Sequence, residues 1–215
     1  MAKKKRTKKN DDITTKVEKT VKSAARSVTR AVKKATEGKQ YGNLHELLIL
    51  KLQSLYDIEK QLVAALPKLS RAAESRELKD AFDLHLNETR THVRRLEEAM
   101  YILGVNPKTE KVAGIRGIAE DGDWIAGHTT ARTRDAALIA AAQYAEHYEI
   151  AGYQAAREWA AMMEHTQVAD LLDATLLEEH AANEKLAELA HNGINQRAGG
   201  IPMEESVEEA DIARM

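Results

Sequence analysis

The sequence predicts an all-α fold, a four-helix bundle made of two helical hairpins. Its composition favours helices, since 43% of the 215 residues are hydrophobic and the chain contains only 3 Pro and 11 Gly. Apolar residues also recur every three or four positions over four long segments, which is the spacing of one helix face. The length suits one domain with tails better than two domains.

The first hairpin is predicted over residues 43–103. Its first helix, over 43–70, is indicated by residues that alternate steps of four and three along one stripe, namely Leu48, Leu52, Leu55, Glu59, Leu62, Leu66 and Leu69. Pro67 falls inside this stripe and should kink the helix or begin its end. The second helix is expected over 77–103, and Gly104 should end it.

The second hairpin is predicted from two further helices, over 133–164 and 166–191, the latter closed by Asn192 and Gly193. Between the hairpins lies an irregular crossover, residues 105–132, with a short extra helix expected near 113–125. Short links within each pair of helices and one long link between the pairs are typical of the ferritin-like four-helix bundle. We therefore expect that bundle over residues 41–197.

The two tails differ in charge. Residues 1–40 hold 14 Lys and Arg against 4 Asp and Glu, although the whole chain has a net charge of only −2. We expect this basic arm to be largely disordered or weakly helical, and either to contact nucleic acid nonspecifically or to be a solvated tail. Residues 198–215 begin with a Gly-Gly-Ile-Pro break and are predicted to form a flexible acidic tail.

Composition also excludes several classes of site. The chain contains no Cys, so disulfides, thiolate metal sites and Cys nucleophiles are excluded. No apolar run reaches the length of a membrane span, and no hydrophobic segment follows the basic start as it would in a secretory signal. We therefore expect a cytoplasmic protein that does not contact a membrane.

Acidic residues stand where the helix stripes demand apolar ones. Glu59 interrupts the leucines of the first helix, and the stripe of the second is interrupted by His85, Glu88 and His92. The other two helices place further acids on apolar faces, namely Glu146, Glu149, Glu178 and Glu179. The two hairpins align at an offset of 90 residues, which pairs Glu59 with Glu149 and Glu88 with Glu178.

Four buried carboxylates require balancing cations, because burying an unpaired ionised carboxylate is very costly. Two divalent metal ions would balance four Glu, and His92 would add a nitrogen ligand on the same helix face as Glu88. Oxygen-rich ligation with imidazole favours iron or manganese over zinc. The usual di-iron pattern has one Glu from each of two helices and Glu-x-x-His from each of the others. This chain departs from it with Glu88-x-x-x-His92, and with Ala181 three residues after Glu178.

Three assignments stay open at this point. The repeat favours Glu178 as the ligand of the last helix, whereas the heptad rhythm of Leu172 and Leu186 favours Glu179. The acid that does not bind metal would then lie next to the ligand, outside the shell of atoms that bind the metal. Glu146 is either an extra ligand or a hydrogen-bonding neighbour. His85 fits a hydrogen-bonded core histidine better than a ligand.

Four segments resemble the YciE/YciF-type family of bacterial ferritin-like proteins. They are LYDIEKQL (55–62), HLNETRTHVRRLEE (85–98), AEHYEIAGY (145–153) and LLEEHAANEKLAELA (176–190). The resemblance covers residues 43–192 and neither tail. It implies a ferritin-like fold with an extra short helix, a homodimer and a link to bacterial stress responses. It also implies a di-metal site formed by Glu59, Glu88, His92, Glu149 and Glu178, but no particular substrate.

Three functions compete. The first is a di-metal protein that oxidises Fe(II) or removes peroxide or dioxygen, an oxidase or peroxidase type of activity. The second is a DNA-associated protective protein that uses the basic arm. The third is a metal-free structural helical dimer. No nucleophile triad, phosphate loop or dinucleotide fingerprint is evident in the sequence.

Overall fold

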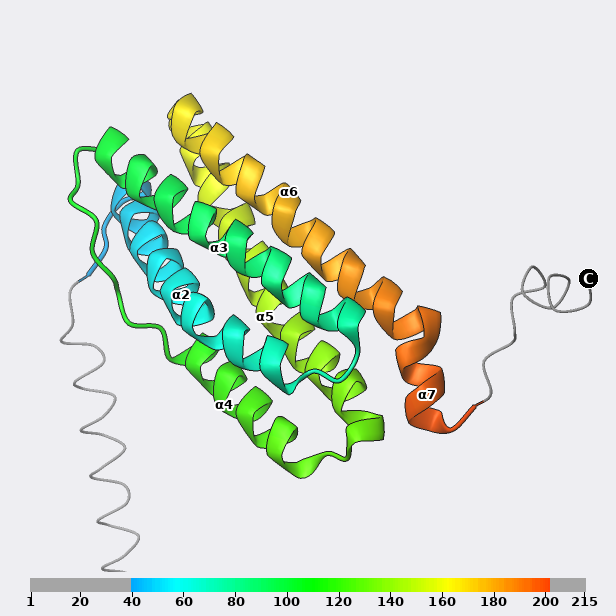
Figure 1. The fold of residues 1–215 in the computed structure, drawn as a ribbon. Coiled ribbons are helices and arrows are strands. Elements are labelled where there is room, and N and C mark those ends of the chain that lie inside the picture. The colour runs from blue at the N-terminus through cyan, green and yellow to red at the C-terminus, as the bar shows by residue number, and fades with distance from the viewer. Residues whose placement is uncertain (1–39, 202–215) are drawn as a thin grey trace, which may run out of the picture. The chain divides into compact units, whose positions relative to one another are not determined.

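The computed structural model describes residues 40–201, and the regular structure in that range is entirely helical. The elements are α2 (Leu44–Ala72), α3 (Arg76–Ile102), α4 (Ala113–His128), α5 (Ala131–Met162), α6 (Thr166–Leu189), a π-helical turn η1 (Ala190–Ile194) and α7 (Asn195–Gly199). The predicted helical bundle of two hairpins is therefore confirmed (Figure 1). The predictions for the basic arm, and for all but the first residues of the acidic tail, lie outside the described range.

Most helix boundaries follow the signals in the sequence. The Asn43 side chain accepts a hydrogen bond from the backbone N–H of Glu46 at 2.9 Å and so caps the start of α2. Gly104 follows α3 with a φ of +72°, the left-handed conformation that lets the chain leave a helix. The short helix expected in the crossover is α4, which extends three residues further than predicted, to His128.

Two boundaries differ from the predictions. Helix α2 was predicted to end at residue 70 and ends at Ala72, so Pro67 lies inside its last turns, as predicted. At the other end of the chain, Gly193 breaks the helical path with a φ of +138°, as predicted. The chain then resumes a helical turn as α7, so residues 198 and 199 end a helix and do not begin the tail.

The core lies between the two hairpins. Helix α2 packs on α3 and α5 packs on α6 within the hairpins, while α2–α5 and α3–α6 contacts join the hairpins to each other. Figure 1 shows these four long helices side by side, with α4 lying along α5. A Cβ atom on Gly152 would lie 2.9 Å from Leu55 Cδ2, so this glycine permits the close approach of α5 to α2. That approach occurs one turn from Glu149.

The crossover is fixed to the first hairpin by backbone contacts. The N–H of Val112 donates to the Asp57 carboxylate at 2.9 Å, and the N–H of Glu110 donates to the Gln53 carbonyl at 3.0 Å. Ile115 then buries α4 against the bundle. Between residues 40 and 201, no helix is long and apolar enough to cross a membrane.

Candidate metal centre

Six ionisable side chains meet in the middle of the bundle. Each of the four long helices contributes at least one of them, and each is at most 6% exposed: Glu59 from α2, His85 and His92 from α3, Glu146 and Glu149 from α5, and Glu179 from α6. The spacing of the helix stripes explains this placement, because every one of these residues occupies a position that the apolar rhythm directs inward. The core of the bundle is therefore interrupted by a single polar layer.

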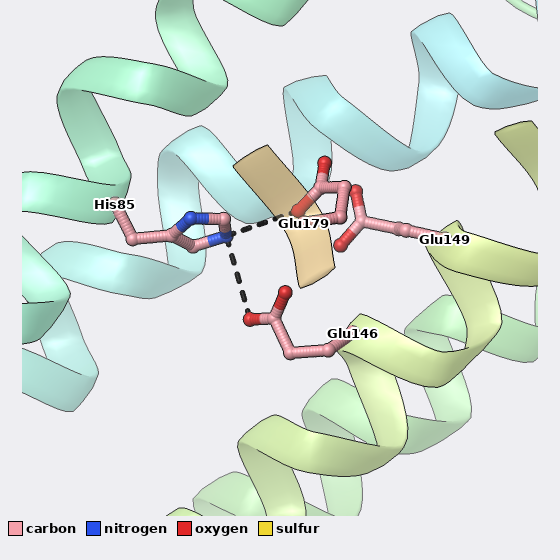
Figure 2. A group of neighbouring side chains, drawn as sticks. All are labelled: His85, Glu146, Glu149 and Glu179. Carbon is pink, nitrogen blue, oxygen red and sulfur yellow. Dashed lines mark ion pairs between the residues drawn. The ribbon is translucent and has the colours of Figure 1, made fainter. Parts of the chain in front are cut away.

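Cluster A consists of His85, Glu146, Glu149 and Glu179. One ligand atom from each lies within 4.8 Å of those of the others, a spacing that suits a metal ion. Figure 2 shows the four side chains pointing toward one another from α3, α5 and α6. His85 Nε2 lies 3.4 Å from Glu146 Oε1 and 3.8 Å from Glu179 Oε2.

Cluster B consists of Glu59, His92 and Glu179, whose ligand atoms also lie within 4.8 Å of one another. His92 Nδ1 is 3.0 Å from Glu179 Oε1 and 3.5 Å from Glu59 Oε1. The buried hydroxyl of Tyr153 donates a hydrogen bond to Glu59 Oε1. Glu179 belongs to both clusters, so its carboxylate lies between them.

The inner atoms of this layer lack hydrogen-bond partners within the described part of the chain. Both oxygens of Glu149 and Glu179, one oxygen each of Glu59 and Glu146, and His92 Nδ1 are buried and unpaired. Buried polar atoms are nearly always paired, and leaving one unpaired costs about 1–3 kcal/mol. A group of unpaired acceptors that face one another indicates a site for a positively charged ligand.

The raised pKa values of the buried carboxyls also indicate a site for a positively charged ligand. Burial, reinforced by the neighbouring carboxylates, raises the pKa of Glu59 and raises that of Glu149 well above its usual value. For Glu146 burial raises the pKa to about 8 even though His85 opposes the shift. Without a cation, the Glu146 carboxyl therefore holds a proton at neutral pH.

The pKa values of the two histidines are raised as well, but by the neighbouring carboxylates and against the effect of burial. Burial alone would lower the pKa of His85, but the neighbouring carboxylates Glu146 and Glu88 outweigh it and raise the pKa to about 9. For His92, burial is likewise outweighed by Glu179 and Glu59, which raise its pKa to about 10. In the metal-free protein the histidines therefore supply part of the positive charge that the acids require.

Glu88 and Glu178 do not belong to either cluster, although both were predicted ligands. Each is about one-third exposed and contacts a histidine from the outside. Glu88 Oε2 lies 3.3 Å from His85 Nδ1, and Glu178 Oε2 lies 2.8 Å from His92 Nε2. In both cases the opposite ring nitrogen faces the buried carboxylates. The pair that the internal repeat matches, Glu88 and Glu178, thus occupies equivalent outer positions.

Arg95 holds Glu178 in its outer position. Its guanidinium donates two hydrogen bonds to the carboxylate, at 2.5 and 2.9 Å. The hydrogen bonds from Arg95 lower the pKa of Glu178, so this carboxylate is charged at neutral pH. Of the two alternatives on α6, it is Glu179 that points into the core, as the heptad rhythm indicated.

The donor inventory matches the usual di-iron set in number but not in position. That set has four Glu and two His, with Glu-x-x-His on two helices. Here Thr89 stands three residues before His92, and Ala182 stands three residues after Glu179. Glu146 and His85 bring the carboxylate and the imidazole that those two positions lack. The polar layer thus contains two imidazoles, the number in the usual set.

His85 is the residue that sequence reasoning placed outside the site. It was interpreted as a hydrogen-bonded core histidine, although it stands on the same stripe as Glu88 and His92. Its distance from His92 was the available signal, because seven residues are two helical turns and place both rings on one face. The structure brings both imidazoles into the polar layer, with ring centroids 6.3 Å apart.

Comparison with known proteins identifies the family of this fold. Residues 43–199 match the family described as a domain of unknown function, DUF892. Over 157 residues the chain is 38% identical to the protein YciF of Escherichia coli strain K12, covering 72% of this chain and 95% of YciF.

Solved structures agree with that assignment. The crystal structure of the E. coli stress protein YciF matches with a TM-score of 0.69 and 36% identity, over 73% of this chain and 99% of that one. YcfI from Rhodopseudomonas palustris, named as a candidate structural protein, matches with a TM-score of 0.68 and 33% identity, over 70% and 96% of the two chains. The resemblance predicted from the four helix motifs is confirmed, and the chain belongs to the DUF892 family of YciF-type helical proteins.

Proposed function

We propose that this chain is a di-metal carboxylate protein that binds two divalent ions, iron or manganese, in the polar layer of the bundle. The observation that carries the proposal is the set of buried, unpaired donor atoms in clusters A and B. Four buried carboxylates carry four negative charges when ionised, and two divalent ions match them. Oxygen-rich ligation with one imidazole in each cluster favours iron or manganese over zinc.

Each cluster would hold one ion, and Glu179 would serve both. In cluster A the donors are His85 Nε2 and the carboxylates of Glu146 and Glu149, and in cluster B they are His92 Nδ1 and Glu59. A pair of such ions supplies redox equivalents and a place for oxygen species to bind. The chain supplies the water-poor cavity and the fixed positions of the donors.

Glu88 and Glu178 would act on the histidines and not on the ions. A metal-binding imidazole usually donates its other N–H to a carboxylate, which fixes the tautomer and the ring orientation. Glu88 faces His85 Nδ1 and Glu178 faces His92 Nε2, which leaves the inner nitrogens free to bind metal. Arg95 keeps Glu178 charged and therefore able to accept that hydrogen bond.

The biological role that we propose is oxidation of Fe(II), or consumption of peroxide, during bacterial stress. Membership of the YciF-type family supports it, since the E. coli relative is a stress protein. We also propose that the chain forms a homodimer, and that residues 1–40 add nonspecific contact with nucleic acid. The charge of that arm supports the second of these, with 14 basic residues against 4 acidic ones.

A metal-free structural role is the competing proposal. The R. palustris relative is named as a candidate structural protein, and the protonated histidines offer the acids some positive charge without any metal. The helical bundle is compatible with both roles. They differ in metal content, because a purely structural dimer has no reason to retain ions through purification.

The deciding experiment measures metal in protein purified without chelators and then loaded with Fe(II) or Mn(II). We expect about two ions per chain, because the donors form two clusters. Less than one ion per two chains would refute the di-metal proposal and favour the structural role. Anomalous scattering at the iron and manganese edges would then locate each ion relative to Glu178 and Glu179.

A further inference from the structure

A cavity of about 210 Å³ lies beside cluster A, between α3, α5 and α6. Most of its wall is apolar and includes Phe82, Leu84, Ala182 and Leu186. The rest of the wall is polar and is formed by Glu88, Lys185 and two members of cluster A, His85 and Glu146. Glu59 and His92 do not line it, so this cavity leads to one cluster and not to the other.

The small side chain of Ala182 accounts for part of this cavity. The usual di-iron set would place a histidine at the position of Ala182. This chain has a methyl group there, while the imidazole comes from His85 on α3. Moving the imidazole to another helix therefore leaves a volume next to cluster A that no side chain fills.

The inner end of the cavity offers a buried hydrogen-bond acceptor. Glu146 is 3% exposed, and its Oε2 atom has no hydrogen-bond partner within the described residues. Lys185 also lines the cavity, but its ammonium group lies 2.8 Å from Glu188 and is half exposed. Since that charge is already paired, the cavity offers an acceptor at its inner end and no free cation for an anion.

We propose that this cavity binds a small, largely apolar molecule that ends in a single O–H group, the chemistry shared by phenols, alcohols and organic hydroperoxides. The apolar part lies against Phe82 and Leu186, and the O–H group points to Glu146 and His85. The volume is adequate, because an apolar cavity of about 150 Å³ accommodates benzene. The inference rests on the proposed function in one respect only: if cluster A binds a metal ion, the O–H group of the bound molecule would face that ion.

Binding of para-fluorophenol to the metal-free full chain, followed by fluorine NMR, tests the inference. We expect saturable binding, and para-fluorotoluene should bind about tenfold more weakly because it cannot donate to Glu146. Ala182→Leu should weaken phenol binding about tenfold or more by filling the cavity. Ala181→Leu, on the exposed part of the wall, is a second variant that does not disturb the core.

Ala141→Leu is the matched control. Ala141 lines a separate cavity of about 230 Å³ between α2, α4 and α5, which contains none of the residues of clusters A and B. Phenol binding should be unchanged in this variant. The inference would be overturned by any of three results. These are no saturable binding of para-fluorophenol to the wild type, equal affinity of the wild type for para-fluorotoluene, or binding of para-fluorophenol by both Ala181→Leu and Ala182→Leu as tight as that of the wild type.

Metal titration of the same samples separates the two proposals. If the protein binds phenol but no metal, the cavity stands as a binding site and the di-metal proposal fails. If the protein takes up two ions but shows no phenol binding, the di-metal proposal stands and the cavity inference fails.

Discussion

Replacing Glu179 by Gln should remove metal binding from both clusters at once. Glu179 is the residue that clusters A and B share, it is fully buried, and both of its oxygens are unpaired within the described residues. The neighbouring residue offers a matched control with the same substitution. Glu178 is about one-third exposed, so Glu178→Gln changes the outer partner of His92 and the ion pair with Arg95 but leaves the buried carboxylates in place.

The two variants should differ in stoichiometry and in affinity. We expect Glu179→Gln to fall from about two ions per chain toward none, because each cluster loses a ligand and a charge. Glu178→Gln should still load two ions, but about 10- to 100-fold more weakly, as is usual when the outer partner of a metal-binding histidine is lost.

Thermal unfolding should report the same difference. An ion present at 100 times its dissociation constant stabilises the fold by about 2.7 kcal/mol, which is about 5–10 °C in Tm for a domain of this size. That gain should be absent in Glu179→Gln. Without metal, the same variant should unfold at a higher temperature than the wild type, because it removes one of four crowded buried acids.

Metal analysis after loading with Mn(II), paired with calorimetry of loaded and metal-free samples, makes the measurement. Wild-type stoichiometry and affinity in Glu179→Gln would refute our account of the centre. Loss of ions in Glu178→Gln but not in Glu179→Gln would instead restore Glu178 as the ligand on α6.

Three further predictions follow from the same structure. The Tm gain produced by Mn(II) should grow as pH rises from about 4.5 to about 9. Ionising buried Glu146 destabilises the metal-free fold as pH rises from 4.5 through about 8, and the stability that protonated His85 contributes below pH 6.5 is lost as pH rises through about 9; calorimetry that finds a constant gain would contradict this. Gly152→Ala should lower the free energy of unfolding by about 1 kcal/mol through the contact with α2, whereas Gly117→Ala, with open space around its Cβ position, should raise it by a similar amount in a urea titration. Deleting residues 1–40 should abolish salt-dependent DNA binding in a gel-shift assay, and binding that survives the deletion would exclude the arm as its source.

The fold was predictable because its signals are local. Leucine spacing defines α2, and the glycines at positions 104 and 193 stop helices by adopting positive φ values. Each of these signals acts over a few residues, so the sequence alone displays it. The helical turn α7 after Gly193 was not predictable in the same way, because α7 packs on α5, a contact that no local signal displays.

The site was predictable in its residues and less so in their roles. Burial of Glu59, Glu146 and Glu149 followed from helix periodicity, which fixes the direction of a side chain to within a fraction of a turn. Glu178 and Glu179 are adjacent, so periodicity separates them by about 100°, and the internal repeat favoured the wrong one for the inner position. A sequence repeat identifies residues in equivalent positions. Glu88 and Glu178 are equivalent because each contacts the outer ring nitrogen of a histidine.

Under the di-metal proposal, motif spacing fails at this centre for a physical reason. A metal binds donor atoms of suitable type whichever helix carries them, so a ligand absent from one helix can be supplied by another. Thr89 and Ala182 occupy the two places where the usual set has Glu and His, while Glu146 and His85 reach the same layer from α5 and α3. The count of four Glu and two His is thereby kept, although both Glu-x-x-His motifs are broken. Ala182 lines the cavity beside cluster A, so Ala182→His should fill part of the cavity and, under the di-metal proposal, add a donor to cluster A.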